Sequence, residues 1–219
     1  MSFSSFLVQI KYPLAYPQAL KFAEQALAIH KETNNRILAG TTLNNIGIVY
    51  YSRGEYAEAL VSLQQALAIH KETKNRAEEG TTLNNIGLVY TAQAQYDQAL
   101  KAYQQALVLH EAVGNKSIVG TTLNNIGLIY YSRSQYTQAL DSFQGGVKIA
   151  RDSFNRSLEA IGLNNIGLTY TATGEYVQAL AAYQRAKSIA TEIGDKSSVA
   201  QILISTGLVY ANQSLYTQA

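Results

Sequence analysis

The sequence predicts an all-α protein in which antiparallel helix pairs stack into an α-solenoid. Two observations lead to this prediction. The segment TTLNNIG starts at Thr41, Thr81 and Thr121, and the related segment IGLNNIG ends at Gly167, so the pattern returns every 40 residues. Each period also holds two stretches whose apolar residues recur at helical spacing. A period of this length is typical of proteins built from stacked supersecondary repeats.

The first helix of a repeat is predicted from Leu43, Ile46, Gly47 and Tyr50, which recur at i, i+3, i+4 and i+7 and so share one helix face. Gly47 lies on this face, where the missing side chain allows a close approach of the partner helix. Good N-cap residues precede each first helix and are predicted to start it. They are Asn35, Asn75, Asn115, Asn155 and Asp195.

The second helix is predicted from Ala59, Leu63, Ala66 and Leu67, which follow the same spacing. The segment YSRGEY separates the two helices, and its Gly54 suits a tight turn. One repeat is therefore helix, turn, helix and loop.

These spacings resemble the tetratricopeptide repeat over nearly the whole chain, with Tyr103, Phe143 and Tyr183 supplying the usual aromatic at the place of Leu63. The 40-residue length and the LNN-I-G core are most similar to the long repeats of kinesin light chain, Pins-type adaptors and many bacterial arrays. The resemblance implies a right-handed solenoid. We expect a single array over residues 1–219, with about five repeats, the first degenerate and the last truncated.

Three departures from the family pattern modify this expectation. Lys71 stands where the short form of the repeat usually ends in proline, so the second helix should run longer here. The first repeat has Ser4 and Ser5 in place of the asparagines, and the last has Ile204 and Ser205. The chain stops at LYTQA, which by the repeat pattern is four residues into the second helix of its last repeat.

Composition excludes several functional classes. The 219 residues carry a formal charge of only +2, which does not favour nucleic acid or an anionic membrane as partner. The sequence has no cysteine, so it has neither disulfides nor thiolate metal sites. The N-terminal residues lack the basic region of a signal peptide, and no apolar run approaches the ~18 residues of a spanning helix. We expect a cytoplasmic protein.

The repeated asparagine pair needs a reason, because asparagine costs up to ~0.7 kcal/mol relative to alanine inside a helix. A helical wheel places Asn45 on the face turned away from the partner helix and Asn44 on the flank. Two interpretations stay open. The amides either bond each other or neighbouring first helices, or they form a ladder of donors and acceptors for the main chain of a bound peptide.

In the adaptors that this sequence resembles, asparagines at this place hold the main chain of a peptide in the concave groove. The resemblance therefore implies a peptide-binding site. The helical wheel places threonines on the same face as the asparagines and a row of apolar residues, the apolar wall, beside them. The expected site residues are Asn44, Asn45, Asn84, Asn85, Asn124, Asn125, Asn164, Asn165, Thr41, Thr81, Thr121, Ile48, Leu88, Leu128, Leu168, Tyr51 and Tyr131. Repeats that capture a terminal carboxylate carry Lys and Arg at these positions, so that kind of site is not expected.

Neither catalysis nor metal binding is expected. His30, His70 and His110 repeat at 40-residue spacing, but equivalent residues of neighbouring repeats lie roughly 10 Å apart, too far to share one ion. They are predicted to be partly buried and bonded to a carbonyl. No catalytic triad order, phosphate loop or ligand cluster occurs in the sequence. We expect no enzyme activity, no cofactor and no metal.

The sequence thus favours a non-catalytic adaptor that binds an extended or helical protein segment. Two alternatives stay open: a structural scaffold that assembles through its ends, and a regulatory array within a larger signalling protein. Leu203, Gly207 and Tyr210 are expected to form an apolar stripe without a partner in the last repeat. Three outcomes stay open for this stripe: further chain covers it, a second copy packs on it to form a homodimer through the C-terminal end, or the last helix frays at low concentration.

Overall fold

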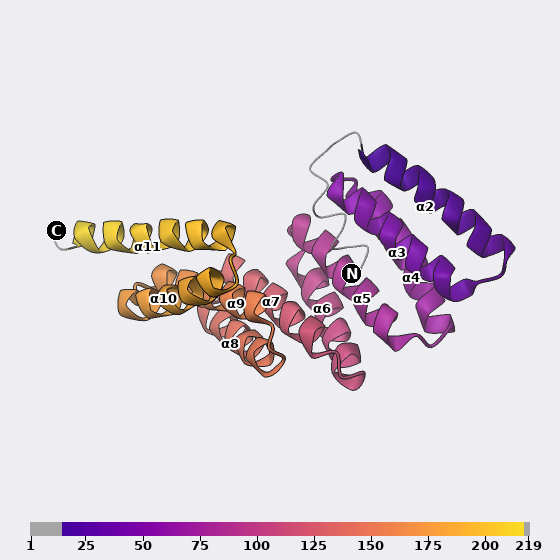
Figure 1. Cartoon of the computed structure of the whole chain (residues 1–219). Coiled ribbons are helices and arrows are strands. Elements are labelled where there is room, and N and C mark those ends of the chain that lie inside the picture. The colour runs from indigo at the N-terminus through magenta and orange to yellow at the C-terminus, as the bar shows by residue number, and fades with distance from the viewer. Residues whose placement is uncertain (1–14, 217–219) are drawn as a thin grey trace. The chain divides into compact units, whose positions relative to one another are not determined.

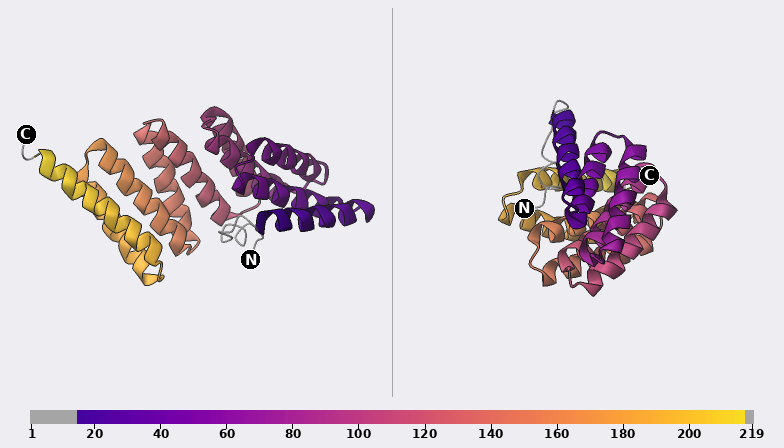
Figure 2. Two further views of the ribbon diagram at one scale, coloured as in Figure 1. Left: turned by 90° about the horizontal axis from the view of Figure 1, so that it is seen from above. Right: turned by 90° about the vertical axis from the view of Figure 1, so that its right-hand side faces the viewer.

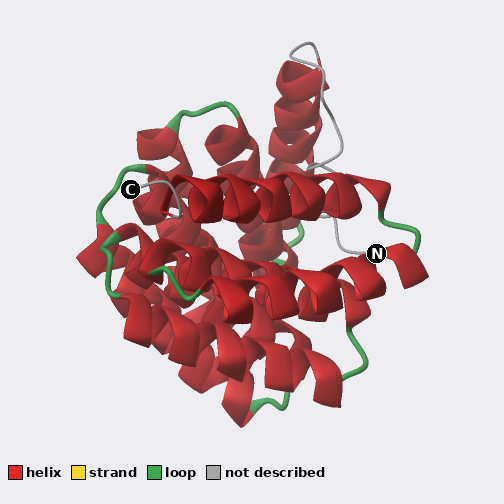
Figure 3. Cartoon of the chain, turned by 90° about the vertical axis from the view of Figure 1, so that its left-hand side faces the viewer, coloured by secondary structure: helices red, strands yellow, loops and turns green. Residues whose placement is uncertain are grey.

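The predicted all-α class is confirmed in the computed structural model, which describes residues 15–216 and has no strand within that range. Short loops join the helices (Figure 3). The helices are α2 (Ala15–Glu32), α3 (Arg36–Ser52), α4 (Tyr56–Glu72), α5 (Arg76–Ala92), α6 (Tyr96–Ala112), α7 (Lys116–Ser132), α8 (Tyr136–Asp152), α9 (Arg156–Thr173), α10 (Tyr176–Glu192) and α11 (Lys196–Tyr216). Lys71 lies inside α4, so the longer second helix is confirmed. Ser4 and Ser5 lie outside the described residues.

Within the described residues the fold has two compact parts, residues 15–114 and residues 115–216. In the first part, α2 to α6 pack in chain order, each against the next, and the first helices α3 and α5 also touch (Figure 1). In the second part, α7 to α11 pack in the same way, and the first helix α9 touches both α7 and α11 (Figures 1 and 2). Odd-numbered helices are the first helices of the repeats, and even-numbered helices are the second.

Side chains at the start of each first helix cap it as the sequence predicts. The side-chain oxygen of Asn35 accepts a hydrogen bond from the backbone N–H of Leu38 at 3.2 Å. Asn75, Asn115 and Asn155 make the equivalent bond at 3.4, 3.4 and 3.1 Å, and Asp195 makes it at 3.0 Å. Each bond satisfies a backbone donor that the helix itself leaves unpaired.

The turn inside each repeat uses a left-handed residue. Gly54 has φ of 78°, as expected for a glycine turn, and Gly174 has φ of 80°. Ala94 and Ser134 hold φ of 56° and 57° in the equivalent turns, although side chains disfavour this region. The same backbone turn therefore joins each helix pair whether or not glycine is present.

Close packing at the repeated glycine of the first helix is confirmed. A Cβ built on Gly87 would lie 2.6 Å from the ring of Tyr103, and one on Gly127 would lie 2.6 Å from the ring of Phe143. Gly167 meets Tyr183 in the same way, and Gly47 meets Leu63. Glycine at this place lets a large side chain of the second helix lie directly on the backbone of the first.

The end of the described chain differs from the expectation. A turn and a new helix were predicted before Tyr216, but α11 continues unbroken from Lys196 to Tyr216. A residue with a side chain adopts the left-handed turn conformation only at a cost, and the continued helix avoids it. The apolar stripe of α11 is exposed as predicted, with Leu203 at 52% and Tyr210 at 58%.

Alanine substitutions at two adjacent glycines in α8, Gly145 and Gly146, are expected to change stability in opposite directions. A Cβ on Gly146 would lie 3.1 Å from the carbonyl oxygen of Gly120, whereas a Cβ on Gly145 would meet only Leu123 Cδ1 at 3.4 Å. We expect Gly145→Ala to stabilise the protein by roughly 0.5–1 kcal/mol, because alanine loses less backbone entropy in a helix. The same change at Gly146 should destabilise it, and urea unfolding of the two variants measures both effects. A loss of stability in Gly145→Ala would contradict the prediction.

Candidate functional site

The asparagine pairs of the first helices differ in burial within each pair. Asn44, Asn84, Asn124 and Asn165 are between 5% and 9% exposed. Their neighbours Asn45, Asn85, Asn125 and Asn164 are half-buried. The buried partner is the first asparagine of the pair in α3, α5 and α7 and the second in α9.

Two of these amides join first helices of successive repeats. In the first part, the Asn85 amide donates a hydrogen bond to Asn44 Oδ1 at 2.9 Å, which links α5 to α3. In the second part, Asn165 donates to Asn124 Oδ1 at 2.8 Å, which links α9 to α7. The interpretation that the amides bond neighbouring first helices is confirmed for these two pairs, although the helical wheel placed the Asn45 register on the face turned away from the partner helix. A wheel considers only the partner in the same repeat, whereas these amides meet the first helix of the preceding repeat.

Other asparagines retain hydrogen-bonding capacity. Within residues 15–216, the side-chain amides of Asn45 and Asn125 make no hydrogen bond, and Asn164 Oδ1 is buried without a donor. Asn164 lines a small hollow of about 70 Å³ between the first helices α9 and α11, together with Ile161, Ser198 and Gln201. A buried carbonyl oxygen without a donor costs about 1–3 kcal/mol, so a hydrogen-bond donor that enters the hollow can be stabilised by this oxygen.

The threonines and the apolar wall lie around these amides. The hydroxyls of Thr41, Thr81 and Thr121 donate to carbonyls of their own helices at 3.3, 3.0 and 3.1 Å, so only their lone pairs are available to a ligand. Leu88 and Leu168 are half-buried, and Leu128 is 39% exposed.

One wall residue is placed differently from the expectation. Ile48 is only 7% exposed because Tyr16, Ala19 and Leu20 of α2 cover it. The wheel could not show this, because α2 belongs to the preceding repeat. Ile48 is therefore a core contact between repeats and not a free wall residue.

Each of the two tyrosines of the wall packs against a second tyrosine across the turn. The ring of Tyr51 lies 6.0 Å from that of Tyr56, and the ring of Tyr131 lies 5.7 Å from that of Tyr136. Burial raises the pKa of the Tyr51 and Tyr131 hydroxyls above the usual tyrosine value, so both stay neutral hydrogen-bonding groups. The site is accordingly uncharged and partly apolar. Arg53, one of the two arginines that follow these tyrosines in the sequence, forms an ion pair with Glu55 at 2.7 Å.

The histidines differ from the prediction that each would bond a carbonyl. His70 and His110 are completely buried, and no hydrogen bond of normal geometry reaches either ring nitrogen. Burial lowers the pKa of both, and the nearby backbones of Gly40 and Gly80 oppose only part of this shift. Both rings are therefore neutral core groups that pack on these glycines.

Two further classes of site find no support in the described part of the chain. Residues 15–216 hold no cluster of three or more His, Cys, Asp or Glu side chains that could bind a metal ion. No described helix combines the length and the hydropathy needed to cross a membrane.

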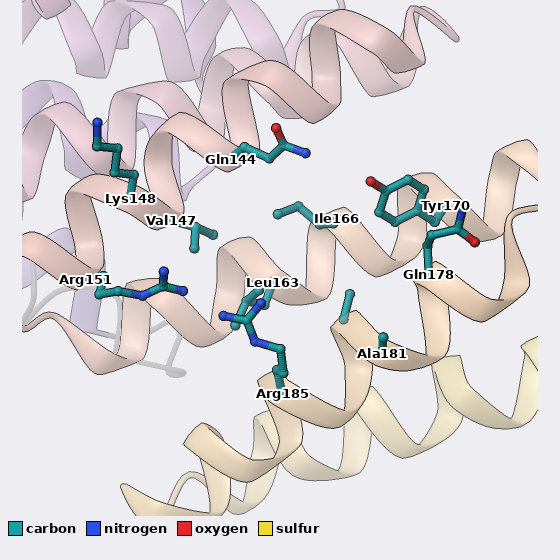
Figure 4. Close-up of a pocket in the computed structure, with 11 residues that line it drawn as sticks. Gln144, Val147, Lys148, Arg151, Leu163, Ile166, Tyr170, Gln178, Ala181 and Arg185 are labelled. Atoms are coloured by element: carbon teal, nitrogen blue, oxygen red, sulfur yellow. The ribbon is translucent and has the colours of Figure 1, made fainter.

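One feature was missed at the sequence level: a hollow of about 390 Å³ between α8, α9 and α10 (Figure 4). Its floor is apolar and formed by Val147, Leu163, Ile166 and Ala182. Arg151 and Arg185 lie toward one end, and Tyr170 and Gln178 lie toward the other (Figure 4).

A buried ion pair holds one side of this hollow in place. Arg151 donates from Nε and Nη2 to Glu159 Oε1, both at 3.1 Å, and Arg156 donates to Glu159 Oε2 at 2.7 Å. The Glu159 side chain is only 4% exposed, so the two arginines neutralise a buried carboxylate. Arg156 also pairs with Glu192 of α10 at 2.5 Å, which ties α9 to α10.

Comparison with known proteins agrees with this fold. The family model of the tetratricopeptide repeat matches residues 15–72, 78–152 and 158–219. No curated protein matches the chain. The structure is similar to BtubC (BKLC) from P. vanneervenii, with a TM-score of 0.81, 16% identity, and coverage of 91% of this chain and 85% of that one.

Two further solved structures are similar and larger. Aspartyl phosphate phosphatase F from Bacillus subtilis matches with a TM-score of 0.84, 19% identity, and coverage of 92% of this chain and 54% of that one. A Rap protein complexed with Competence and Sporulation Factor matches with a TM-score of 0.75, 17% identity, and coverage of 91% and 59%. At these identities the likeness concerns the fold alone. With its 40-residue period and the family match over most of its length, the chain belongs to the tetratricopeptide repeat family.

Proposed function

We propose that this chain is a non-catalytic interaction module that binds an extended or helical segment of a partner protein along the first helices of its repeats. The observation that carries the proposal is the buried, unpaired Asn164 Oδ1 in the hollow between α9 and α11. A peptide main chain offers an N–H donor at every residue except proline, and one such donor satisfies this oxygen. Asn45 and Asn125 offer unpaired amides on other first helices.

The neutral surroundings support a peptide rather than a charged ligand. The half-buried Leu88 and Leu168, the exposed Leu128 and the neutral Tyr51 and Tyr131 offer apolar contact beside the amides. In such a complex the amides fix the register of the bound peptide and the apolar contacts supply affinity, as in other modes of peptide recognition. The Rap protein of similar fold holds Competence and Sporulation Factor, so this architecture supports a bound partner.

The neighbouring residues Asn164 and Asn165 provide a matched test of the proposal. Asn164→Ala should raise stability, by about 1–3 kcal/mol because the unpaired oxygen is removed and by up to ~0.7 kcal/mol because alanine is the better helix former. Asn165→Ala should cost about 1–3 kcal/mol, since it leaves the buried Asn124 Oδ1 without its donor. Urea unfolding measures both.

Binding is measured with a peptide selected on the wild-type protein from a displayed random library. We expect Asn164→Ala to weaken that peptide about tenfold, the equivalent of about 1.4 kcal/mol. Asn45→Ala and Asn125→Ala should weaken peptides that bind along their own helices. If Asn164→Ala and Asn45→Ala both fold normally and bind every selected peptide as the wild type does, the asparagine site is not used.

Self-association through α11 is a second candidate function. Leu203, Ile204, Leu208 and Tyr210 are each more than half exposed, and no described atom lies within 4 Å of a Cβ built on Gly207. The equivalent surface of α9 is covered by Tyr183 of α10. A second copy that packs the same stripe against this one gives a closed two-fold contact.

This candidate predicts dimers that form with rising protein concentration in sedimentation experiments. Leu203→Glu should abolish them, because it places a charge in the buried contact. Val177→Glu is the control, since Val177 is 77% exposed on α10 and lies outside the stripe. A wild-type protein that stays monomeric over a hundredfold concentration range would exclude this contact.

A further inference from the structure

The hollow between α8 and α10 is built from residues that depart from the repeat pattern. Lys148 stands where the other repeats have Ala28, Ala68, Val108 and Ser188. Arg185 stands where they have Gln25, Gln65, Gln105 and Gly145. Two neighbouring second helices thus gained a cation each at positions that are uncharged elsewhere.

A third departure makes the space. Val147 replaces the leucine found at residues 27, 67 and 107, and the smaller side chain leaves room above Leu163 and Ile166. On the opposite wall, Ala181 and Ala182 have small side chains that leave the space unfilled. The cations and the hollow therefore occur together in one place.

The hollow is a trough that runs along both helices. Its lining residues on α8 are 144, 147, 148 and 151, and those on α10 are 178, 181, 182 and 185. Both sets follow the spacing i, i+3, i+4 and i+7, so each wall is two helical turns long, roughly 10 Å. Figure 4 shows the two walls facing each other across α9.

The charge of the trough is positive. Arg151 is engaged by Glu159, whereas Lys148 and Arg185 have no acidic partner in the described part of the chain. No Asp or Glu lines the trough. Glu175 lies beside the other end, where it accepts a hydrogen bond from Gln178 at 3.1 Å.

Exposure of the rim favours a macromolecular occupant. Gln144, Lys148, Arg151, Ala181 and Arg185 are all exposed, while the floor is buried. A small ligand needs most of its surface covered, and an open trough covers only one face of it. A partner helix presents one apolar face to the floor and leaves its other face in solvent. Acidic residues that flank such a face reach Lys148 on one wall and Arg185 on the other.

From these observations, we propose that the trough between α8 and α10 docks an amphipathic helical segment of a partner protein, with bulky apolar side chains on the floor and flanking carboxylates on Lys148 and Arg185. The two walls of the trough belong to second helices, and the trough shares no lining residue with the hollow at Asn164, so the inference does not rest on peptide binding along the first helices. It adds a second partner site to the C-terminal part of the protein.

The probe is a fluorescein-labelled synthetic helical peptide with leucines on one face and glutamates on both flanks, compared with the same peptide carrying glutamine in place of glutamate. We expect the wild type to bind the glutamate peptide at least tenfold more tightly, with affinity that falls as salt rises. Lys148→Glu and Arg185→Glu should each weaken it at least tenfold. Lys187→Glu is the matched control, because Lys187 is exposed on the same helix as Arg185 but does not line the trough, and it should change affinity less than twofold.

A volume variant separates shape from charge. Ala181→Trp fills the trough from an exposed position without changing its charge, and it should abolish binding while the circular dichroism and thermal unfolding stay those of the wild type. Asn164→Ala should leave binding of this probe unchanged, so failure here is distinct from failure of the peptide site on the first helices.

Several results would overturn the inference. They are no binding of the glutamate peptide, equal binding of the two peptides, or equal effects of Arg185→Glu and Lys187→Glu. Saturable binding of a small apolar anion such as anilinonaphthalene sulfonate at this trough, without binding of the peptide, would assign the trough to a small ligand instead.

Discussion

Gly167→Ala is expected to destabilise the C-terminal part of the protein by about 3 kcal/mol, the upper end of the usual cost of overpacking. The added Cβ would lie 2.6 Å from Tyr183 Cε1, a distance that real Cβ atoms do not show. Tyr183 cannot easily withdraw, because it is 1% exposed and its hydroxyl lies 3.3 Å from Thr171 Oγ1 on α9. The change therefore forces α9 and α10 apart along their contact. Urea unfolding followed by circular dichroism measures the loss.

Gly207→Ala is the matched control, since Gly207 has the same place in the repeat pattern and a Cβ there meets no described atom within 4 Å. This variant should gain roughly 0.5–1 kcal/mol, because only the backbone entropy term remains. Combining Gly167→Ala with Tyr183→Leu should cost less than the sum of the two single changes, since a smaller side chain relieves the overlap. Equal and favourable effects at Gly167 and Gly207 would show that the close contact does not exist in solution.

The protein is also expected to lose stability as the pH falls below about 6.5, the ordinary pKa of histidine. His70 and His110 are fully buried without a hydrogen-bond partner, and burial lowers the pKa of both in the folded protein. Above this pH both histidines are neutral in the folded and in the unfolded protein, so they add no pH dependence to the free energy of unfolding. Below this pH the two histidines bind protons in the unfolded chain but stay neutral in the folded protein, so protonation favours unfolding. The loss reaches at most about 1.4 kcal/mol per pH unit for each histidine, until the pH passes the lowered folded pKa.

The repeat formed by α9 and α10 offers a natural control for this pH dependence. Ala190 takes the place of His70 there, and Ala160 takes the place of Gly40. A variant with alanine at Gly40, His70, Gly80 and His110 copies this pairing at both histidine sites, where a Cβ on Gly40 would otherwise lie 2.8 Å from the His70 ring. Its free energy of unfolding should change little between about pH 7 and about pH 5.5, above the range where most carboxylates titrate. The same slope in variant and wild type would assign the effect to other groups.

Interactions between residues close together in the chain account for the helices and turns of this fold. Caps such as Asn35 and Asn75, the turn at Gly54 and the spacing of Leu43, Ile46 and Tyr50 act over a few residues, so the periodic pattern displays them directly. Gly47 was also placed correctly, because it lies on the apolar face that meets the second helix of its own repeat. Because these local interactions recur at the same positions in successive repeats, they favour one assignment of helices and turns over any other.

The contacts that the remaining side chains make between neighbouring repeats became clear from the packing of the helices. It pairs Asn85 with Asn44 and Asn165 with Asn124, leaves Asn164 Oδ1 unpaired, and covers Ile48 with α2. It also brings Lys148 and Arg185, 37 positions apart in the sequence, to opposite walls of one trough. These relations depend on how closely successive helices approach, which is set by side-chain volumes at contacts 30 to 40 residues apart, such as Gly40 under His70. A helical wheel contains no information on that distance. The sequence pattern therefore identifies these side chains but does not predict which residues of the neighbouring repeat they contact.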